Sequence, residues 1–78
     1  MLLTSGQIRA ARGFLGWSAR QLAEAASLGL STVQRAESGG SITTANMSAI
    51  RRAFEAAGVV FIPENGGGEG VRLKLSNA

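Results

Sequence analysis

The stretch WSARQLAEAASLGLSTVQRAESG, residues 17–39, contains two short amphipathic segments separated by the break SLG. The second segment carries apolar side chains on one helical face and hydrogen-bonding side chains on another. The hydrogen-bonding side chains are Ser31, Gln34, Arg35 and Ser38. Two helices joined by a turn of three or four residues form a helix-turn-helix, whose second helix enters the DNA major groove. The spacing therefore indicates this motif, although many small helical domains contain a similar helix pair.

A recurring pattern marks four helix starts along the chain. An apolar residue precedes a possible N-cap, and a second apolar residue follows five positions after the first. The apolar pairs are Leu3 with Ile8, Trp17 with Leu22, Leu28 with Val33, and Ile42 with Met47. Together with apolar stripes at helical spacing, they predict helices over residues 5–14, 19–26, 30–37 and 44–57. As one of these paired apolar residues, Trp17 is expected in the core rather than in a binding site.

The periodicity changes after Gly58. The runs VVFI (59–62) and VRLKL (71–75) are typical of short strands, and PENGGGEG between them is typical of a hairpin loop. This glycine-rich loop has neither the Gly-Lys-Ser/Thr ending nor the following helix of a phosphate-binding loop. The predicted fold is therefore mainly α, with a short C-terminal β-strand pair.

Composition narrows the classes of function. The chain has 78 residues, enough for one small domain, and a formal charge of +3, with Arg supplying seven of its eight cations. Arg suits phosphates and guanine edges, although +3 is equally compatible with a solvated basic surface. The chain has no Cys and no His, which removes the usual zinc ligands and the commonest catalytic base. We therefore expect no metal site, no cofactor and no enzyme.

The apolar segments are too short for a membrane protein. No apolar run approaches ~18 residues, and the Arg residues of the N-terminal segment do not precede an apolar core as they would in a signal peptide. We therefore expect a cytoplasmic protein with no membrane association.

Residues 17–39 resemble the repressor/Cro-like family of helix-turn-helix proteins, also called the xenobiotic-response-element family. The shared features are Ser18 as a cap, LAEAA at 22–26, STVQRAESG at 31–39, and Glu37 at the end of the second helix. The family implies a DNA-binding protein.

The resemblance covers roughly residues 4–58, and the tail is similar to that of short single-domain members. It implies a lambda-repressor-like bundle of four or five helices. The implied organisation is a helix-turn-helix DNA-binding domain at 1–58 and a C-terminal β extension at 59–78.

The resemblance also implies roles for individual residues. Base edges would be read by Leu30, Ser31, Gln34 and Arg35. The phosphate backbone would be held by Ser18, Arg20, Thr32 and Ser38. Arg12 and Glu37 would form a structural ion pair. Three positions depart from the family pattern: Ser27 replaces the turn Gly, Gly29 replaces a Ser/Thr cap, and Leu30, often polar, can read only apolar features such as a thymine methyl. For each polar residue the alternative is a solvated helix face.

These observations predict a transcriptional regulator, a repressor, that binds double-stranded DNA as a homodimer on a palindromic operator. The alternative is an antitoxin or antiactivator that acts mainly by binding a protein partner. Dimerisation is expected through Val59, Val60, Phe61, Ile62, Val71, Leu73 and Leu75. A lone hairpin is marginal in water, so we expect the two strands to pair across a two-fold axis. The alternative is that the hairpin folds onto Phe54 of its own chain.

Overall fold

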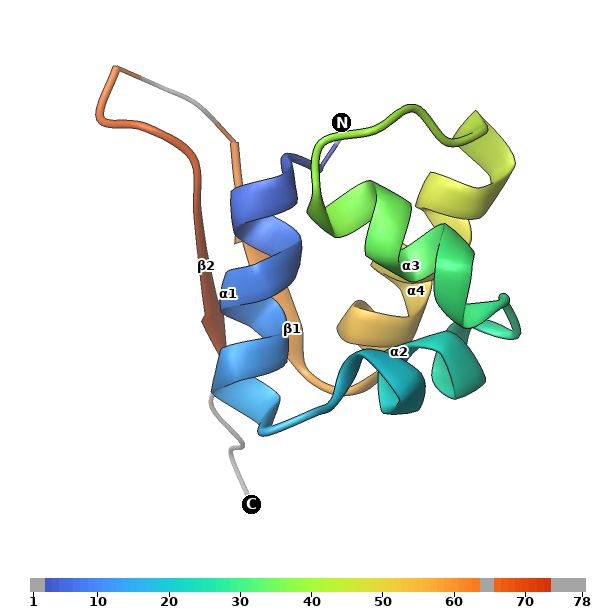
Figure 1. The fold of residues 1–78 in the computed structure, drawn as a ribbon. Coiled ribbons are helices and arrows are strands. Elements are labelled where there is room, and N and C mark those ends of the chain that lie inside the picture. Colours follow the sequence, from blue (N-terminus) through green and yellow to red (C-terminus); the bar gives the residue numbers. More distant parts are fainter. Residues whose placement is uncertain (1–2, 64–65, 74–78) are drawn as a thin grey trace.

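The computed structural model describes residues 3–63 and 66–73, which form four helices followed by a two-stranded antiparallel sheet (Figure 1). The elements are α1 (Ser5–Leu15), α2 (Ala19–Ala26), α3 (Leu30–Glu37), α4 (Thr44–Ala56), β1 (Val59–Ile62) and β2 (Gly70–Leu73). The predicted mainly α fold is confirmed, and every helix begins at the predicted residue. Helix α1 ends one residue later than predicted and α4 one residue earlier. No helix in the described ranges is long and apolar enough to cross a membrane.

Local capping sets the helix starts. In three helices a Ser or Thr hydroxyl accepts a hydrogen bond from the backbone N–H three residues later, which satisfies an amide that has no partner inside the helix. The pairs are Thr4 with Gln7 (3.1 Å), Ser18 with Gln21 (3.1 Å) and Thr43 with Asn46 (3.0 Å). Helix α3 begins after Gly29, which has no side chain to cap it.

Helices α1, α2 and α3 end in the same way. A left-handed residue follows α1 and α2 directly, and follows α3 after Ser38. These residues are Gly16 (φ 66°), Ser27 (φ 58°) and Gly39 (φ 86°). The next amide then donates to a carbonyl five residues earlier. These bonds run from Trp17 to Arg12 (3.0 Å), from Leu28 to Ala23 (2.9 Å) and from Gly40 to Arg35 (2.8 Å). This is the Schellman motif, and it turns the chain sharply enough to keep the connections short.

All four helices contribute to one apolar core. Its largest fully buried side chains are Ile8, Leu22, Val33, Ile50 and Phe54. The Phe54 ring stacks on Trp17 with centroids 5.7 Å apart and meets the edge of Phe61 at 5.9 Å. Trp17 is therefore part of the core packing, as its spacing from Leu22 predicts.

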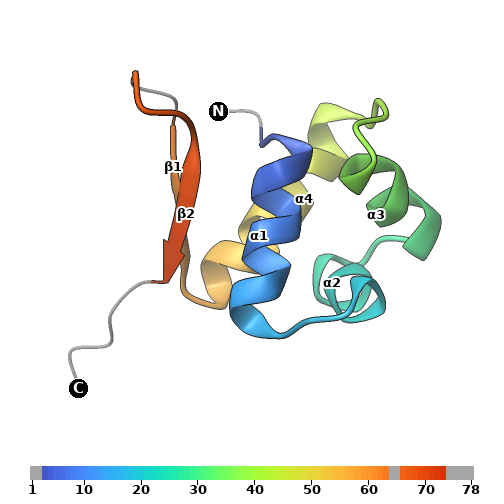
Figure 2. The same cartoon turned by 60° about the vertical axis from the view of Figure 1, so that its left-hand side comes forward.

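The C-terminal strands form a hairpin within the chain. They are antiparallel, with Val59 opposite Leu73 and Ile62 opposite Gly70. Val59 and Phe61 point into the helical core and are 2% and 8% exposed. Figure 2 shows the hairpin as a layer along one side of the helices, next to α1.

This arrangement corrects the expectation that the two strands pair across a two-fold axis. Each strand already has the other as its partner, and the apolar side of the hairpin is covered by the chain's own helices. The hairpin lies against Phe54, as the alternative stated. Val59 and Phe61 are consequently buried in the core and are not available to a second chain. Leu75 and the side chain of Leu73 lie outside the described part of the structure.

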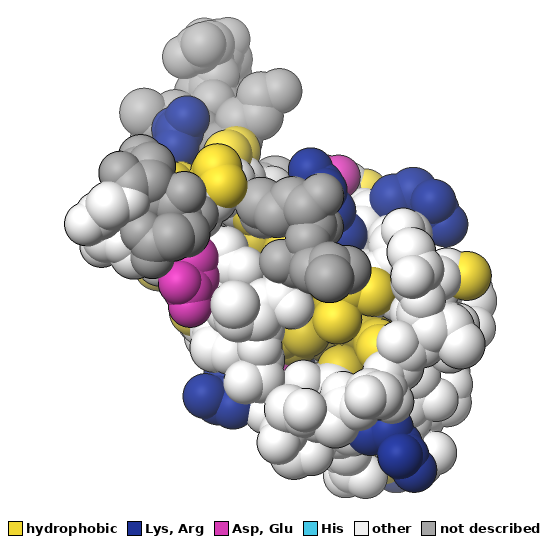
Figure 3. Space-filling model, turned by 90° about the horizontal axis from the view of Figure 1, so that it is seen from above, with side chains coloured by type: hydrophobic (Ala, Val, Ile, Leu, Met, Phe, Trp, Pro, Cys, Tyr) yellow, Lys and Arg dark blue, Asp and Glu magenta, His cyan; other side chains and the backbone are white. Residues whose placement is uncertain are grey.

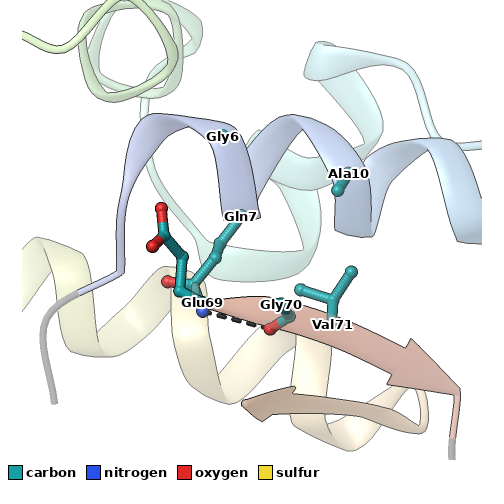
Figure 4. A pocket seen from close by; sticks show the side chains of 6 residues that line it. All are labelled: Gly6, Gln7, Ala10, Glu69, Gly70 and Val71. Carbon is teal, nitrogen blue, oxygen red and sulfur yellow. Dashed lines mark hydrogen bonds between the residues drawn. The ribbon is translucent and has the colours of Figure 1, made fainter. Parts of the chain in front are cut away.

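One side chain fastens the hairpin to α1. Gln7, which is only 3% exposed, donates from Nε2 to the carbonyl oxygens of Ile62 (3.2 Å) and Gly70 (3.1 Å). Its Oε1 accepts the Thr4 amide at 3.0 Å, completing the capping box of α1. Figure 4 shows Gln7 reaching from α1 toward Gly70 beside a small pocket. Gln7 therefore joins a helix start to both strands of the hairpin.

Candidate nucleic-acid interface

Helices α2 and α3 form the predicted helix-turn-helix. Only Ser27, Leu28 and Gly29 separate them, and the left-handed conformation of Ser27 makes the tight turn possible. The pair lies on the side of the bundle away from the hairpin (Figure 2). Nothing in the described C-terminal strands covers it there.

Helix α3 has one buried and one exposed face. Val33 and Ala36 are buried against the other helices, because their spacing places both on the inner side. The exposed face brings together three of the predicted base-reading residues, Ser31, Gln34 and Arg35. The fourth, Leu30, is half-buried at the start of the helix. The exposed face offers a hydroxyl, an amide and a guanidinium, which are the groups that recognise base edges.

The start of α2 can hold a phosphate. Ser18 is exposed, and its Oγ accepts the Gln21 amide at 3.1 Å, which leaves the hydroxyl hydrogen for another acceptor. The amides of the first helical turn have no partners within the helix, and they favour an anion. Arg20 is exposed in the same turn. Thr32, in the first turn of α3, is half-buried.

Ser38, the fourth residue predicted to contact a phosphate, is exposed at the end of α3. Its Oγ donates to the carbonyl oxygen of Arg35 over 3.1 Å, at the end of α3. This bond helps to close the end of α3. Phosphate binding by Ser38 stays a prediction.

An ion pair holds α3 against α1. Arg12 donates from Nε to Glu37 Oε2 (2.6 Å) and from Nη2 to Oε1 (2.9 Å). Its Nη1 donates to the Trp17 carbonyl oxygen at 2.9 Å. The hydrogen bond to Glu37 raises the pKa of Arg12, partial desolvation lowers it, and attraction to the Glu37 charge raises it, with a net upward shift. Arg12 therefore links α1, the residue before the α2 cap, and the end of α3.

Arg9 is a second contact to the same helix end that the sequence interpretation missed. Its Nη1 donates to the Glu37 carbonyl oxygen at 2.6 Å. The sequence spacing could have predicted this contact, since Arg9 and Arg12 are three residues apart and share one face of α1. Gln7 was also missed as a tertiary contact, because its partners are 55 and 63 residues away in sequence.

Among the described residues, the other cations on the face that Figure 3 shows do not gather into one patch. Arg51 pairs with Glu55 at 3.1 Å on the surface of α4, while Arg52 is exposed. Viewed from above, the described surface carries its cationic side chains apart from one another, around hydrophobic side chains near the middle (Figure 3). The groups suited to binding nucleic acid therefore lie on α2 and α3, and the described residues on this face form no basic stripe.

Comparison with known proteins agrees with this geometry. A family model described as Helix-turn-helix matches residues 8–57, which include all of α2 and α3. The chain belongs to the helix-turn-helix family. No curated protein matches it significantly.

Membership of this family confirms part of the sequence prediction. The chain is a DNA-binding transcription regulator, of the type that Cro and lambda repressor represent. The family is regulatory and is not a family of enzymes. The second helix of the matched motif, α3, is the one whose polar face is exposed.

Proposed function

We propose that this helix-turn-helix protein is a repressor of the xenobiotic-response-element type that binds a palindromic operator as a homodimer in the cytoplasm. The observation that carries the proposal is the exposed face of α3 with Ser31, Gln34 and Arg35. Two arginines of α1 anchor the end of this helix at Glu37. A rigid helix with an exposed polar face can read bases in the major groove.

Each side chain on α3 suits a particular base feature. Arg35 can bind O6 and N7 of a guanine through two donors, and Gln34 can pair with N6 and N7 of an adenine. Ser31 can bind several bases through its hydroxyl. Leu30 is half-buried, and its exposed part can contact the methyl group of a nearby thymine. Arg35 is the strongest candidate for specificity because its two parallel hydrogen bonds recognise one base.

Phosphate contacts would fix α3 in the groove. Ser18, Arg20 and the first amides of α2 form one set of donors, and Thr32 lies at the start of α3. Such contacts carry no sequence information, but they set the register of the protein on the duplex.

Dimerisation would place two copies of α3 about one helical turn of DNA apart, ~34–36 Å. With Val59 and Phe61 in the core, we assign the interface to the outer face of the hairpin, where Val60 and Ile62 are half-buried. In a two-stranded sheet each strand also has one unpaired edge, which a second chain can extend.

The test is a binding selection from random duplexes with the full-length chain, followed by sedimentation of the complex. We expect two inverted half-sites with centres about 10 base pairs apart, two chains per duplex, and affinity that falls steeply with salt. In vitro transcription from a promoter overlapping the selected site should fall when the protein is added. Failure to enrich any duplex would favour the alternative of a protein-binding antitoxin or antiactivator.

A further inference from the structure

Gly40 follows the left-handed Gly39 at the end of α3. Its amide donates to the Arg35 carbonyl oxygen over 2.8 Å, as the Schellman motif requires. Unlike Gly39, it does not have a positive φ, so its φ angle does not require a glycine. A left-handed conformation therefore does not explain why position 40 is a glycine.

Arg35 supplies the reason, chiefly through its side chain. A Cβ placed on Gly40 would lie 2.6 Å from Arg35 Cγ and 3.2 Å from the Arg35 carbonyl oxygen. Carbon atoms in contact are separated by about 3.5–4.0 Å, so the two groups cannot share this space. The same construction at Gly13 or Gly29 meets nothing within 4 Å. The stem of Arg35 thus occupies the volume that a side chain at position 40 would fill.

The corresponding positions of the other two Schellman motifs are occupied differently. Trp17 and Leu28 donate the equivalent hydrogen bonds after α1 and α2, and both carry large apolar side chains. A hydrophobic contact at this position commonly accompanies the motif. After α3 the position is a glycine, and the residue that approaches it is an exposed arginine on the helix face with Ser31.

We propose that Gly40 is a positioning residue for Arg35. Its missing Cβ lets the Arg35 stem lie against the loop backbone, which limits the directions from which the guanidinium can leave the helix. A long side chain loses conformational entropy when it is ordered on a ligand, and restriction in the free protein reduces that loss. The inference rests on the proposed function, since it assumes that Arg35 reads a base.

The experiment compares Gly40→Ala, Arg35→Ala and the double variant on the duplex selected with the wild-type chain, and on a scrambled duplex. Gly13→Ala is the matched control, since it adds the same methyl group in open space on α1. Arg35→Ala should weaken operator binding by roughly 5- to 150-fold. Gly40→Ala should cause a smaller loss, roughly 3- to 20-fold, with little change on scrambled DNA. In the Arg35→Ala background, Gly40→Ala should have no further effect.

Two results would overturn the proposal. The first is that Gly40→Ala binds the operator as tightly as the wild-type chain and Gly13→Ala do. The second is that Gly40→Ala lowers operator affinity by the same factor in the Arg35→Ala background as in the wild-type chain. The second result would mean that Gly40 acts through the loop and not through Arg35.

A measurement without DNA separates this inference from the proposed function. In the free wild-type chain, NMR should show a nuclear Overhauser effect between the γ protons of Arg35 and the α protons of Gly40. Its absence overturns the positioning contact, even if Gly40→Ala fails to fold. If the effect is present and no duplex is enriched, the contact stands but base reading by Arg35, and with it the proposed positioning role, is overturned.

Discussion

Arg12 holds Glu37 by two parallel hydrogen bonds, and the same guanidinium binds the Trp17 carbonyl oxygen at 2.9 Å. This one side chain connects the end of the recognition helix to the turn that leads into α2. The two side chains are 26% and 12% exposed, so the pair is largely but not fully withdrawn from water. The recognition helix is therefore fastened to its scaffold by a charge pair as well as by Val33 and Ala36.

Arg12→Ala should destabilise the protein because it leaves Glu37 partly buried without its partner. Removing one member of a fully buried ion pair lowers the free energy of unfolding by more than removing one member of an exposed pair. Because this pair is partly exposed, we expect a loss of about 2 kcal/mol in the free energy of unfolding. The melting temperature should fall by roughly 8–16 °C. Arg20→Ala, at an exposed position on α2, is the control and should melt close to the wild type. Equal melting of Arg12→Ala and wild type would mean that the pair does not support the fold.

Arg35→Ala should weaken operator binding by about 1–3 kcal/mol and leave the melting temperature nearly unchanged. The expected cause is the loss of hydrogen bonds to one base, since Arg35 is exposed on α3. Titration of the selected operator and of random DNA measures the two losses separately. An equal loss on both would show that Arg35 contacts only a phosphate.

Gln7→Glu should loosen the hairpin without removing the cap of α1. A carboxylate can still accept the Thr4 amide, but it cannot donate to the carbonyls of Ile62 and Gly70. We expect a loss of about 1–3 kcal/mol in the free energy of unfolding, with faster hydrogen exchange at the hairpin amides than in α2.

The matched control for that change is Gln21→Glu. Gln21 makes the same capping box with Ser18, but it is exposed and makes no described contact with the hairpin. Its stability should stay within about 0.5 kcal/mol of the wild type. If the two variants have the same stability, the Gln7 bonds to the strands contribute nothing.

Ser27→Gly should stabilise the protein. Ser27 has φ 58°, a left-handed conformation that costs a residue with a Cβ about 1 kcal/mol. Thermal or denaturant unfolding should show a gain of up to that size, offset in part by the greater freedom of glycine in the unfolded chain. Ser27→Ala keeps the Cβ and should show no such gain. A gain in both variants would place the cost in the Ser hydroxyl instead of the backbone.

Val60→Glu should shift the full-length chain from dimer to monomer in sedimentation. Val60 is half-buried on the outer face of the hairpin, directly opposite Arg72. A glutamate there can pair with Arg72, so the hairpin itself should keep its stability while the proposed interface gains a charge. Val60→Thr is the uncharged control. A Val60→Glu dimer as tight as the wild type would exclude this face as the interface.

Much of the helical architecture follows from neighbours in sequence. Thr4, Ser18 and Thr43 each cap an amide only three residues away, and the paired apolar residues lie five positions apart. Because these paired residues lie within a few positions of one another, the sequence predicts all four helix starts and the exposed face of α3. The family resemblance added the pairing of Arg12 with Glu37.

The partner of the hairpin was decided only by the tertiary structure. Alternating apolar residues show that one face of a strand must be buried against another surface. They do not show whether that surface belongs to a second chain or to the chain's own helices. In the structure, Phe61 packs against Phe54 of the same chain. Gln7 donates hydrogen bonds to both strands, although its partners lie more than 50 residues away in sequence. Likewise, only the packed loop after α3 shows that Arg35 fills the space beside Gly40. Contacts of this kind depend on where distant segments meet, and local sequence patterns do not contain that information.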